Sequence, residues 1–138
     1  VSVILPVVNE TYSLYKTVEI IQESSSKYIK EYIIVICKFT SKESLTIIDT
    51  LRKDDPDLII LHKQKLPYLG GALREAFELV KASHLILMAS DLETDPHLVS
   101  SLINEELNMN PPSPYFNKSL SNMIQICGDR KINEYSSL

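Results

Sequence analysis

The chain has 138 residues, 44% of them hydrophobic, which suits one globular domain with a single core. Its net charge is −4, from 14 basic and 18 acidic side chains without a long basic cluster, and this excludes a typical nucleic-acid-binding surface. The widely spaced cysteines at 37 and 127 exclude a disulfide framework or zinc site, and no apolar run approaches the roughly 20 residues of a membrane-spanning helix, so we expect a soluble, cytoplasmic protein with free thiols.

Apolar, β-branched runs alternate with helical patterns along the first 110 residues. Buried strands are predicted at residues 1–5, where Pro6 ends the run, and at 32–37, 58–62 and 84–89. Apolar residues spaced three and four apart predict helices from about residue 14 to 22, from about 41 to 53 and from 73 to 80. Thr40 and Glu43 form a capping box for the second of these helices. Asp95 as N-cap and Pro96 at the first helical position predict a fourth helix.

This alternation predicts a Rossmann-like α/β domain, with a mostly parallel sheet and helices on both faces. Ligands of such sheets bind beyond the carboxyl ends of the strands, where loops diverge and helix N-termini offer N–H groups to anions. The segments PVVNE, at 6–10, and ASDLETDP, at 89–96, both follow a strand at its carboxyl end. We therefore expect both acidic segments to lie at one edge of the sheet and to face one ligand.

Three carboxylates, those of Asp91, Glu93 and Asp95, lie within five residues of each other after the fourth strand. Oxygen ligands of this kind suit Mg²⁺ or Mn²⁺, especially when a substrate diphosphate completes the coordination. Asp95 is expected to cap the following helix instead. Asp91 and Glu93 remain either metal ligands or solvated loop carboxylates.

Other polar residues near the strand ends have two interpretations each. Asn9 and Glu10 either cap the first helix or bind a ribose or base. Gly70 and Gly71 either allow close approach of a phosphate or form a tight turn, and Arg74, one turn further on, either contacts that phosphate or is solvated.

The segments VSVILPVVNE, YIIVIC and LGGALREAFELVKASHLILMASDLETDP, taken in order, resemble the donor half of family 2 glycosyltransferases of the GT-A fold. The resemblance is closest to the branch of dolichol-phosphate mannosyltransferases and covers residues 1 to about 110. It implies that Pro6, Asn9 and Glu10 lie against the nucleotide, and that the segment from Gly70 to Arg74 packs at the donor site. It also implies that Asp91 is the second aspartate of a D-x-D motif that holds a divalent cation, Mg²⁺ or Mn²⁺, with Glu93 at the adjacent ligand position.

Two donor-site carboxylates of that family are missing. Ala89 occupies the position of the first aspartate of the motif, and Cys37 and Lys38 follow the second strand where relatives carry acidic residues. Either the donor is held differently, with Lys38 countering phosphate charge and metal dependence reduced, or the domain is weakened or inactive.

The tail departs further from the family pattern. Apolar residues at 116, 120, 123, 124 and 127 predict an amphipathic helix that packs on the core or meets a membrane or partner. We therefore divide the chain into a donor-binding domain, 1–110, and a C-terminal linker and helix, 111–138. The strand that relatives carry here is absent from the pattern, which predicts that a stretch of the natural chain is missing between Asn108 and Tyr115. Asp129 and Glu134 are candidates for a general base, but the sequence assigns no catalytic residue.

The function expected from these residues is sugar transfer from a nucleotide-diphosphate sugar to a lipid-phosphate or glycan acceptor, with inversion at the anomeric carbon. One alternative is a catalytically weakened nucleotide-sugar-binding module, which fits the missing carboxylates. A nucleotidyltransferase is less favoured, because its glycine-rich, basic phosphate loop near the first strand is missing.

Overall fold

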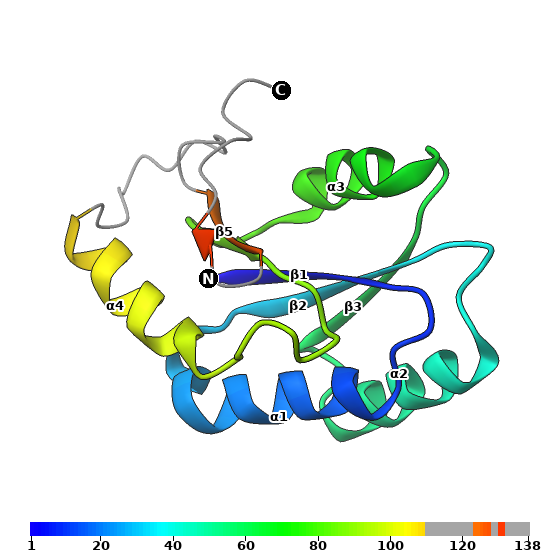
Figure 1. Ribbon diagram of the computed structural model, residues 1–138, viewed down its shortest axis with the longest axis horizontal. Coiled ribbons are helices and arrows are strands. Elements are labelled where there is room, and N and C mark those ends of the chain that lie inside the picture. Colours follow the sequence, from blue (N-terminus) through cyan, green and yellow to red (C-terminus); the bar gives the residue numbers. More distant parts are fainter. Residues whose placement is uncertain (110–122, 128–129, 132–138) are drawn as a thin grey trace.

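The computed structural model describes residues 1–109, 123–127 and 130–131 (Figure 1). Its elements in chain order are β1 (Ser2–Val7), α1 (Tyr12–Ser25), the 3₁₀ turn η1 (Ser26–Tyr28), β2 (Glu31–Ile36), α2 (Lys42–Asp54), β3 (Ile59–Lys63), α3 (Tyr68–Leu79), β4 (Leu85–Leu87), α4 (Leu98–Met109), β5 (Met123–Cys127) and β6 (Arg130–Lys131).

The six strands form one sheet in the order β3-β2-β1-β4-β5-β6. Every neighbouring pair from β3 to β5 is parallel, and only β6 runs antiparallel to its neighbour β5. β1 lies at the centre, between β2 and β4. The predicted Rossmann-like α/β fold with a mostly parallel sheet is therefore confirmed.

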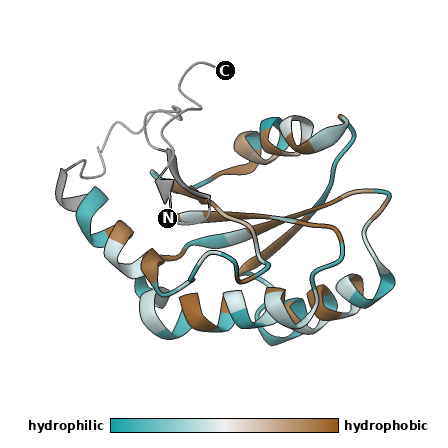
Figure 2. Ribbon diagram, in the orientation of Figure 1, coloured by the Kyte–Doolittle hydropathy of each residue, from teal (hydrophilic) through white to brown (hydrophobic). Residues whose placement is uncertain are grey.

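Helices cover both faces of this sheet (Figure 1). One face packs on α1, α2 and α4 through a core that includes Leu5, Leu14, Ile48, Ile86 and Ile103. The opposite face packs on α3 through a smaller cluster, which includes Ile4, Ile33 and Ala76. Because both faces are covered, the strands are largely apolar, and Figure 2 shows mostly hydrophobic strands between helices in which hydrophobic and hydrophilic residues alternate.

Pro6 lies inside β1 and does not end it, contrary to the sequence interpretation. The N–H of Ser2 donates to the carbonyl of His84, and the N–H of Met88 donates to the carbonyl of Ile4. The even-numbered residues of β1 therefore direct their backbone hydrogen bonds towards β4. The paired register with β4 ends at Ile4. Pro6 has no N–H to donate, but at its position β1 is no longer paired with β4, so no hydrogen bond between these strands is lost. β1 continues to Val7 through its pairing with β2 alone.

The second correction concerns residues 123–127, which form β5 and not part of a helix. The pattern MIQIC fits either period over so short a run, and the exposed edge of β4 offers unpaired backbone groups that a strand satisfies. β5 pairs in parallel with β4, so the sheet includes residues beyond 110. The strand that the sequence analysis found absent from the tail is therefore present. Phe116, Leu120, Asp129 and Glu134 lie outside the described residues, as does most of the segment between Asn108 and Tyr115.

The N-termini of two helices test the predicted caps. Ser41, not Thr40, caps α2: its side chain accepts a hydrogen bond from the N–H of Ser44. α4 begins at Leu98, so Asp95 and Pro96 do not take the predicted N-cap and first helical positions, and the Asp95 carboxylate instead accepts from the N–H of His97 in the turn before the helix.

Candidate functional site

The loops that follow β1, β2, β3 and β4 all leave the sheet at the same edge, because these strands are parallel neighbours. We call this edge the carboxyl rim; the loops entering α1, α2 and α3 lie there together, on the right of Figure 1. The residues predicted for the site lie near the end of β1, in the loops after β1, β2 and β4, and in α3: Pro6, Asn9, Glu10, Lys38, Gly70, Gly71, Arg74, Asp91 and Glu93.

The loop after β1 is held by its own acidic residue. Oε2 of Glu10 accepts hydrogen bonds from the N–H of Val8, at 2.8 Å, and from the N–H of Asn9, at 3.1 Å. The Asn9 side chain is exposed. Glu10 therefore fixes the loop backbone, and Asn9 is the residue of this pair that is free to reach a ligand.

Three hydroxyl residues that the sequence analysis did not assign to the site fasten this loop to the start of α2. Thr40 Oγ1 donates to the carbonyl of Val7 at 2.8 Å and accepts from the N–H of Cys37 at 2.9 Å. The N–H of Ser41 donates to the carbonyl of Val8 at 2.7 Å, and Ser44 Oγ donates to the carbonyl of Glu10 at 2.6 Å. The loops after β1 and β2 therefore form one connected layer.

Lys38 lies at the tip of the loop after β2 and is exposed. Its ammonium lies 5.1 Å from the centre of the Phe39 ring, within the range of a cation–π contact. The Phe39 side chain is itself 73% exposed. A cation and an aromatic face are thus both open to solvent at the rim.

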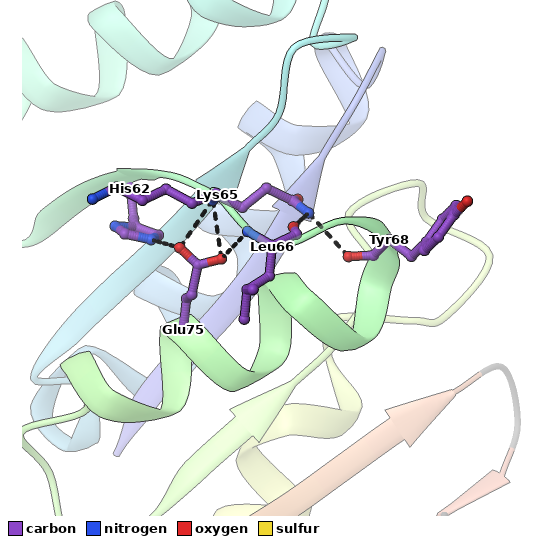
Figure 3. A network of polar contacts seen from close by, with 6 residues as sticks. His62, Lys65, Leu66, Tyr68 and Glu75 are labelled. Atoms are coloured by element: carbon purple, nitrogen blue, oxygen red, sulfur yellow. Dashed lines mark hydrogen bonds and ion pairs between the residues drawn. The ribbon is translucent and has the colours of Figure 1, made fainter.

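Glu75 of α3 holds the loop after β3 (Figure 3). Its carboxylate accepts from the N–H of Lys65, at 3.0 Å to each oxygen, and from the N–H of Leu66 at 2.8 Å. The Nε2 atom of His62 lies 3.0 Å from the same carboxylate. These hydrogen bonds, first the two from the backbone and then that from His62, lower the pKa of Glu75 to about 2.

The two adjacent glycines of α3 have different surroundings. A Cβ at Gly71 would lie 2.6 Å from the carbonyl oxygen of Leu66, whereas a Cβ at Gly70 would meet nothing within 4 Å. Gly71 thus lets the loop lie against the helix. Gly70 and Arg74 are exposed, so both remain able to face a ligand.

The loop after β4 has the polar residues expected of it. Oδ1 of Asp91 accepts from the N–H of Glu93 at 3.0 Å, in a turn where Leu92 has a φ of 66°. Asp91 and Glu93 are exposed, and so is Ala89. Ser90, which lies between Ala89 and Asp91, is fully buried, and its hydroxyl has no hydrogen-bond partner within the described part of the chain.

Asp95 is occupied differently. His97 donates its backbone N–H to this carboxylate and has Nδ1 2.7 Å from the same oxygen, and both hydrogen bonds hold the pKa of Asp95 below its usual value. Asp95 therefore stabilises the entry into α4.

A divalent cation would have few protein ligands here. Among the described residues, no three His, Cys, Asp or Glu side chains come together as a metal site. Mg²⁺ is commonly bound through one or two carboxylates together with substrate phosphates. Asp91 and Glu93 fit a site that substrate phosphates complete, and they do not fit a metal site made of protein ligands alone.

A cavity of about 340 Å³ lies away from the rim. It is lined by residues of α1, the end of α2 and the start of β3, including Tyr15, Gln22, Leu51 and Asp55. This places it toward the amino ends of the strands. The rim is the better candidate for a substrate site, because ligands of parallel α/β sheets bind at the carboxyl ends.

The sequence model of the family described as "Glycosyl transferase family 2" matches residues 2–108. The chain belongs to this family. The match includes β1 to β4 and the four loops of the carboxyl rim. The predicted resemblance to family 2 is therefore confirmed at the level of the family, and the dolichol-phosphate branch stays a prediction.

A curated relative is similar over much of this chain. It is described as "Glycosyltransferase AglD", from Haloferax volcanii, and is 29% identical over 106 residues. The aligned region is 75% of this chain but only 17% of the relative. The similarity therefore concerns one part of a much longer protein.

The two glycines of α3 provide a matched pair of substitutions. Gly70→Ala should raise the free energy of unfolding by up to about 1 kcal/mol, because alanine favours the helix and its Cβ has open space. Gly71→Ala should lower it by about 1–3 kcal/mol, because the new Cβ overlaps the backbone of Leu66. Urea unfolding of both variants measures the difference, and equal stabilities would contradict this account of the loop.

Glu75 makes stability depend on pH in a defined direction. Its folded pKa of about 2 lies below the ordinary 4.5, so its contribution is fully present above about pH 5.5 and is lost as pH falls towards 2. Thermal melts of the wild type and Glu75→Gln between pH 7 and pH 3 should show a gap in melting temperature that narrows at the acidic end. A gap that widens on acidification would show that the sign is wrong.

Proposed function

We propose that this chain is the donor-binding part of a glycosyltransferase, which takes a sugar from a nucleotide-diphosphate sugar to a lipid-phosphate or glycan acceptor. The observation that carries the proposal is the match of family 2 to residues 2–108, which contain every loop of the carboxyl rim. The nucleotide would lie against Pro6, Asn9 and the loop that Glu10 holds. Among the described helices, none is long and apolar enough to cross a bilayer. We propose peripheral association with a cytoplasmic membrane face for a lipid-linked acceptor.

The diphosphate would lie between the two sides of the rim. Lys38 and Arg74 supply exposed cations, and the first turn of α3 begins after Pro67, which provides no side-chain cap for the helix N–H groups. Asp91 and Glu93 would hold a Mg²⁺ or Mn²⁺ ion together with diphosphate oxygens. When bound, that ion neutralises charge on the diphosphate and makes it a better leaving group.

The transfer would proceed by a single displacement. An acceptor oxygen forms a bond to the anomeric carbon from the face opposite the diphosphate, while the bond from that carbon to the diphosphate oxygen breaks with its electron pair. The products are the glycosylated acceptor, inverted at this carbon, and the nucleoside diphosphate. A phosphate acceptor has no proton to lose at this step, whereas a hydroxyl would need a general base.

A nucleotide-sugar-binding module without transfer activity is the second candidate. The observation that favours it is the exposed Ala89, which occupies the position of a carboxylate in the family's D-x-D motif. Lys38 supplies charge but not the geometry of a metal ion. If the domain is active, its dependence on metal should therefore be reduced.

Titration with nucleoside diphosphates tests the donor site. UDP, GDP and the other nucleoside diphosphates, each with and without Mn²⁺, should include one that slows amide exchange in the loops after β1 and β4. Hydrolysis of the matching nucleotide sugar then separates an enzyme from a binding module. If no nucleoside diphosphate changes exchange in either loop, the proposal is wrong.

Asp91 and Asp95 should differ when replaced. Asp91→Ala should weaken metal-linked nucleotide binding and leave the melting temperature nearly unchanged, because Asp91 is exposed and its hydrogen bond to the N–H of Glu93 lies within its own loop. Asp95→Ala should lower the melting temperature, because it removes the hydrogen bonds to His97 in the turn before α4, and should change nucleotide affinity less. Calorimetric titration and thermal melts of both variants provide the comparison, and equal losses of affinity would contradict the assignment of Asp91.

A further inference from the structure

We propose that Glu75 is a positioning residue for donor binding: it holds the loop between β3 and α3, residues 64–67, in the one conformation that presents the start of α3 to the diphosphate. The inference rests on the proposed function for its ligand. Its structural part, the hold on the loop, is independent of that function.

Glu75 forms hydrogen bonds with the loop after β3 and with the strand before it. The carboxylate lies in the second turn of α3, and its oxygens take the N–H groups of two successive loop residues and the ring of His62 from β3. Figure 3 shows these groups converging on the carboxylate from the strand and the loop. Only 16% of its side chain is exposed, so these bonds are partly shielded from water. One side chain thus connects strand, loop and helix.

Glu75 and Gly71 both contact Leu66 of the loop. The two residues are four apart on α3, and side chains at this spacing lie on the same side of a helix. Gly71 leaves the space that the carbonyl of Leu66 occupies, and Glu75 accepts the N–H of the same residue. The helix therefore contacts the loop at two points one turn apart, one steric and one polar.

Gln64 holds two further backbone groups at the end of the loop. Gln64 Nε2 donates to the carbonyls of Leu66, at 2.7 Å, and Tyr68, at 3.0 Å. Tyr68 has a φ of 63°, a left-handed conformation that costs a non-glycine residue free energy and persists only where its surroundings hold it. Its side chain is 87% exposed, so burial of the ring does not stabilise this conformation. The hydrogen bond from Gln64 to the Tyr68 carbonyl acts on this residue directly, and Glu75 fixes Lys65 and Leu66 just before it.

The consequence is a pre-organised entry into α3. The loop hydrogen-bonds to Glu75 and Gln64, while Gly70 stays open and Pro67 places no side-chain cap on the first turn of α3. A loop that is already ordered avoids the entropic cost of ordering on ligand binding. Loss of Glu75 should therefore reduce donor affinity although the residue itself does not touch the donor.

The test compares Glu75→Gln with Glu23→Gln, which makes the same change of charge at an exposed position of α1. In Glu75→Gln, amide exchange of Lys65 and Leu66 should accelerate at least about tenfold, while amides in the centre of β2 stay protected. Its dissociation constant for the nucleoside diphosphate that binds the wild type should rise about tenfold, a loss of about 1.4 kcal/mol. In steady-state transfer the loss should appear in KM for the donor more than in kcat. Glu23→Gln should match the wild type in all three measurements.

Glu75→Asp provides a second, milder variant should the glutamine variant not fold. Its carboxylate still accepts hydrogen bonds, so donor affinity should be partly retained, between that of the wild type and that of Glu75→Gln. Faster loop exchange with unchanged donor affinity would overturn the positioning role, and so would weaker affinity with unchanged exchange. A wild type that binds no nucleoside diphosphate would overturn the proposed function and the donor role together, while loop exchange alone would still decide whether Glu75 holds the loop.

Discussion

The burial of β1 at the centre of a parallel sheet is the constraint on which the rest of the structure depends. Its residues pack against helices on both faces and pair with a strand on each side, so the chain has to cross the sheet repeatedly through helices. The parallel direction brings the ends of β1, β2, β3 and β4 to one edge. The paired register of β1 and β4 ends at Ile4, two residues before Pro6, and the loops diverge beyond it.

At that edge, two acidic residues act on the protein's own backbone. Glu10 accepts the N–H groups of its own loop, and Glu75 accepts those of the loop after β3. The described hydrogen bonds of both carboxylates go to loop N–H groups, with His62 as a further partner of Glu75, so both residues fix the backbone of the rim loops. The exposed charged groups at the rim include the cations of Lys38 and Arg74 and the carboxylates of Asp91 and Glu93. This division of roles suits an anionic ligand that shares a cation with one loop.

On the proposed assignment of Ala89 and Asp91 to the family's D-x-D motif, the missing aspartate would decide how such a ligand is held. With Ala89 exposed and no cluster of three ligating side chains among the described residues, the protein alone offers a divalent ion few contacts. Any ion would depend on the diphosphate for its remaining ligands, so metal and donor affinity should be strongly linked. The longer relative from Haloferax volcanii, of which this chain matches 17%, shows that a similar segment occurs within a larger polypeptide.

The sequence by itself determined the alternation of strands and helices, the parallel sheet and the placing of Asp91, Glu93 and Asn9 at its carboxyl edge, because these follow from local periodicity and from the direction of parallel strands. Only the tertiary structure decided the partners of individual groups. The helical pattern at 123–127 became a strand because β4 had an open edge, and Thr40 bonds across to β1 and leaves the cap to Ser41. Glu75 had no signal in the sequence, since its role depends on a loop that folds back onto its helix, a contact between residues nine and ten positions apart that no helical or strand period encodes.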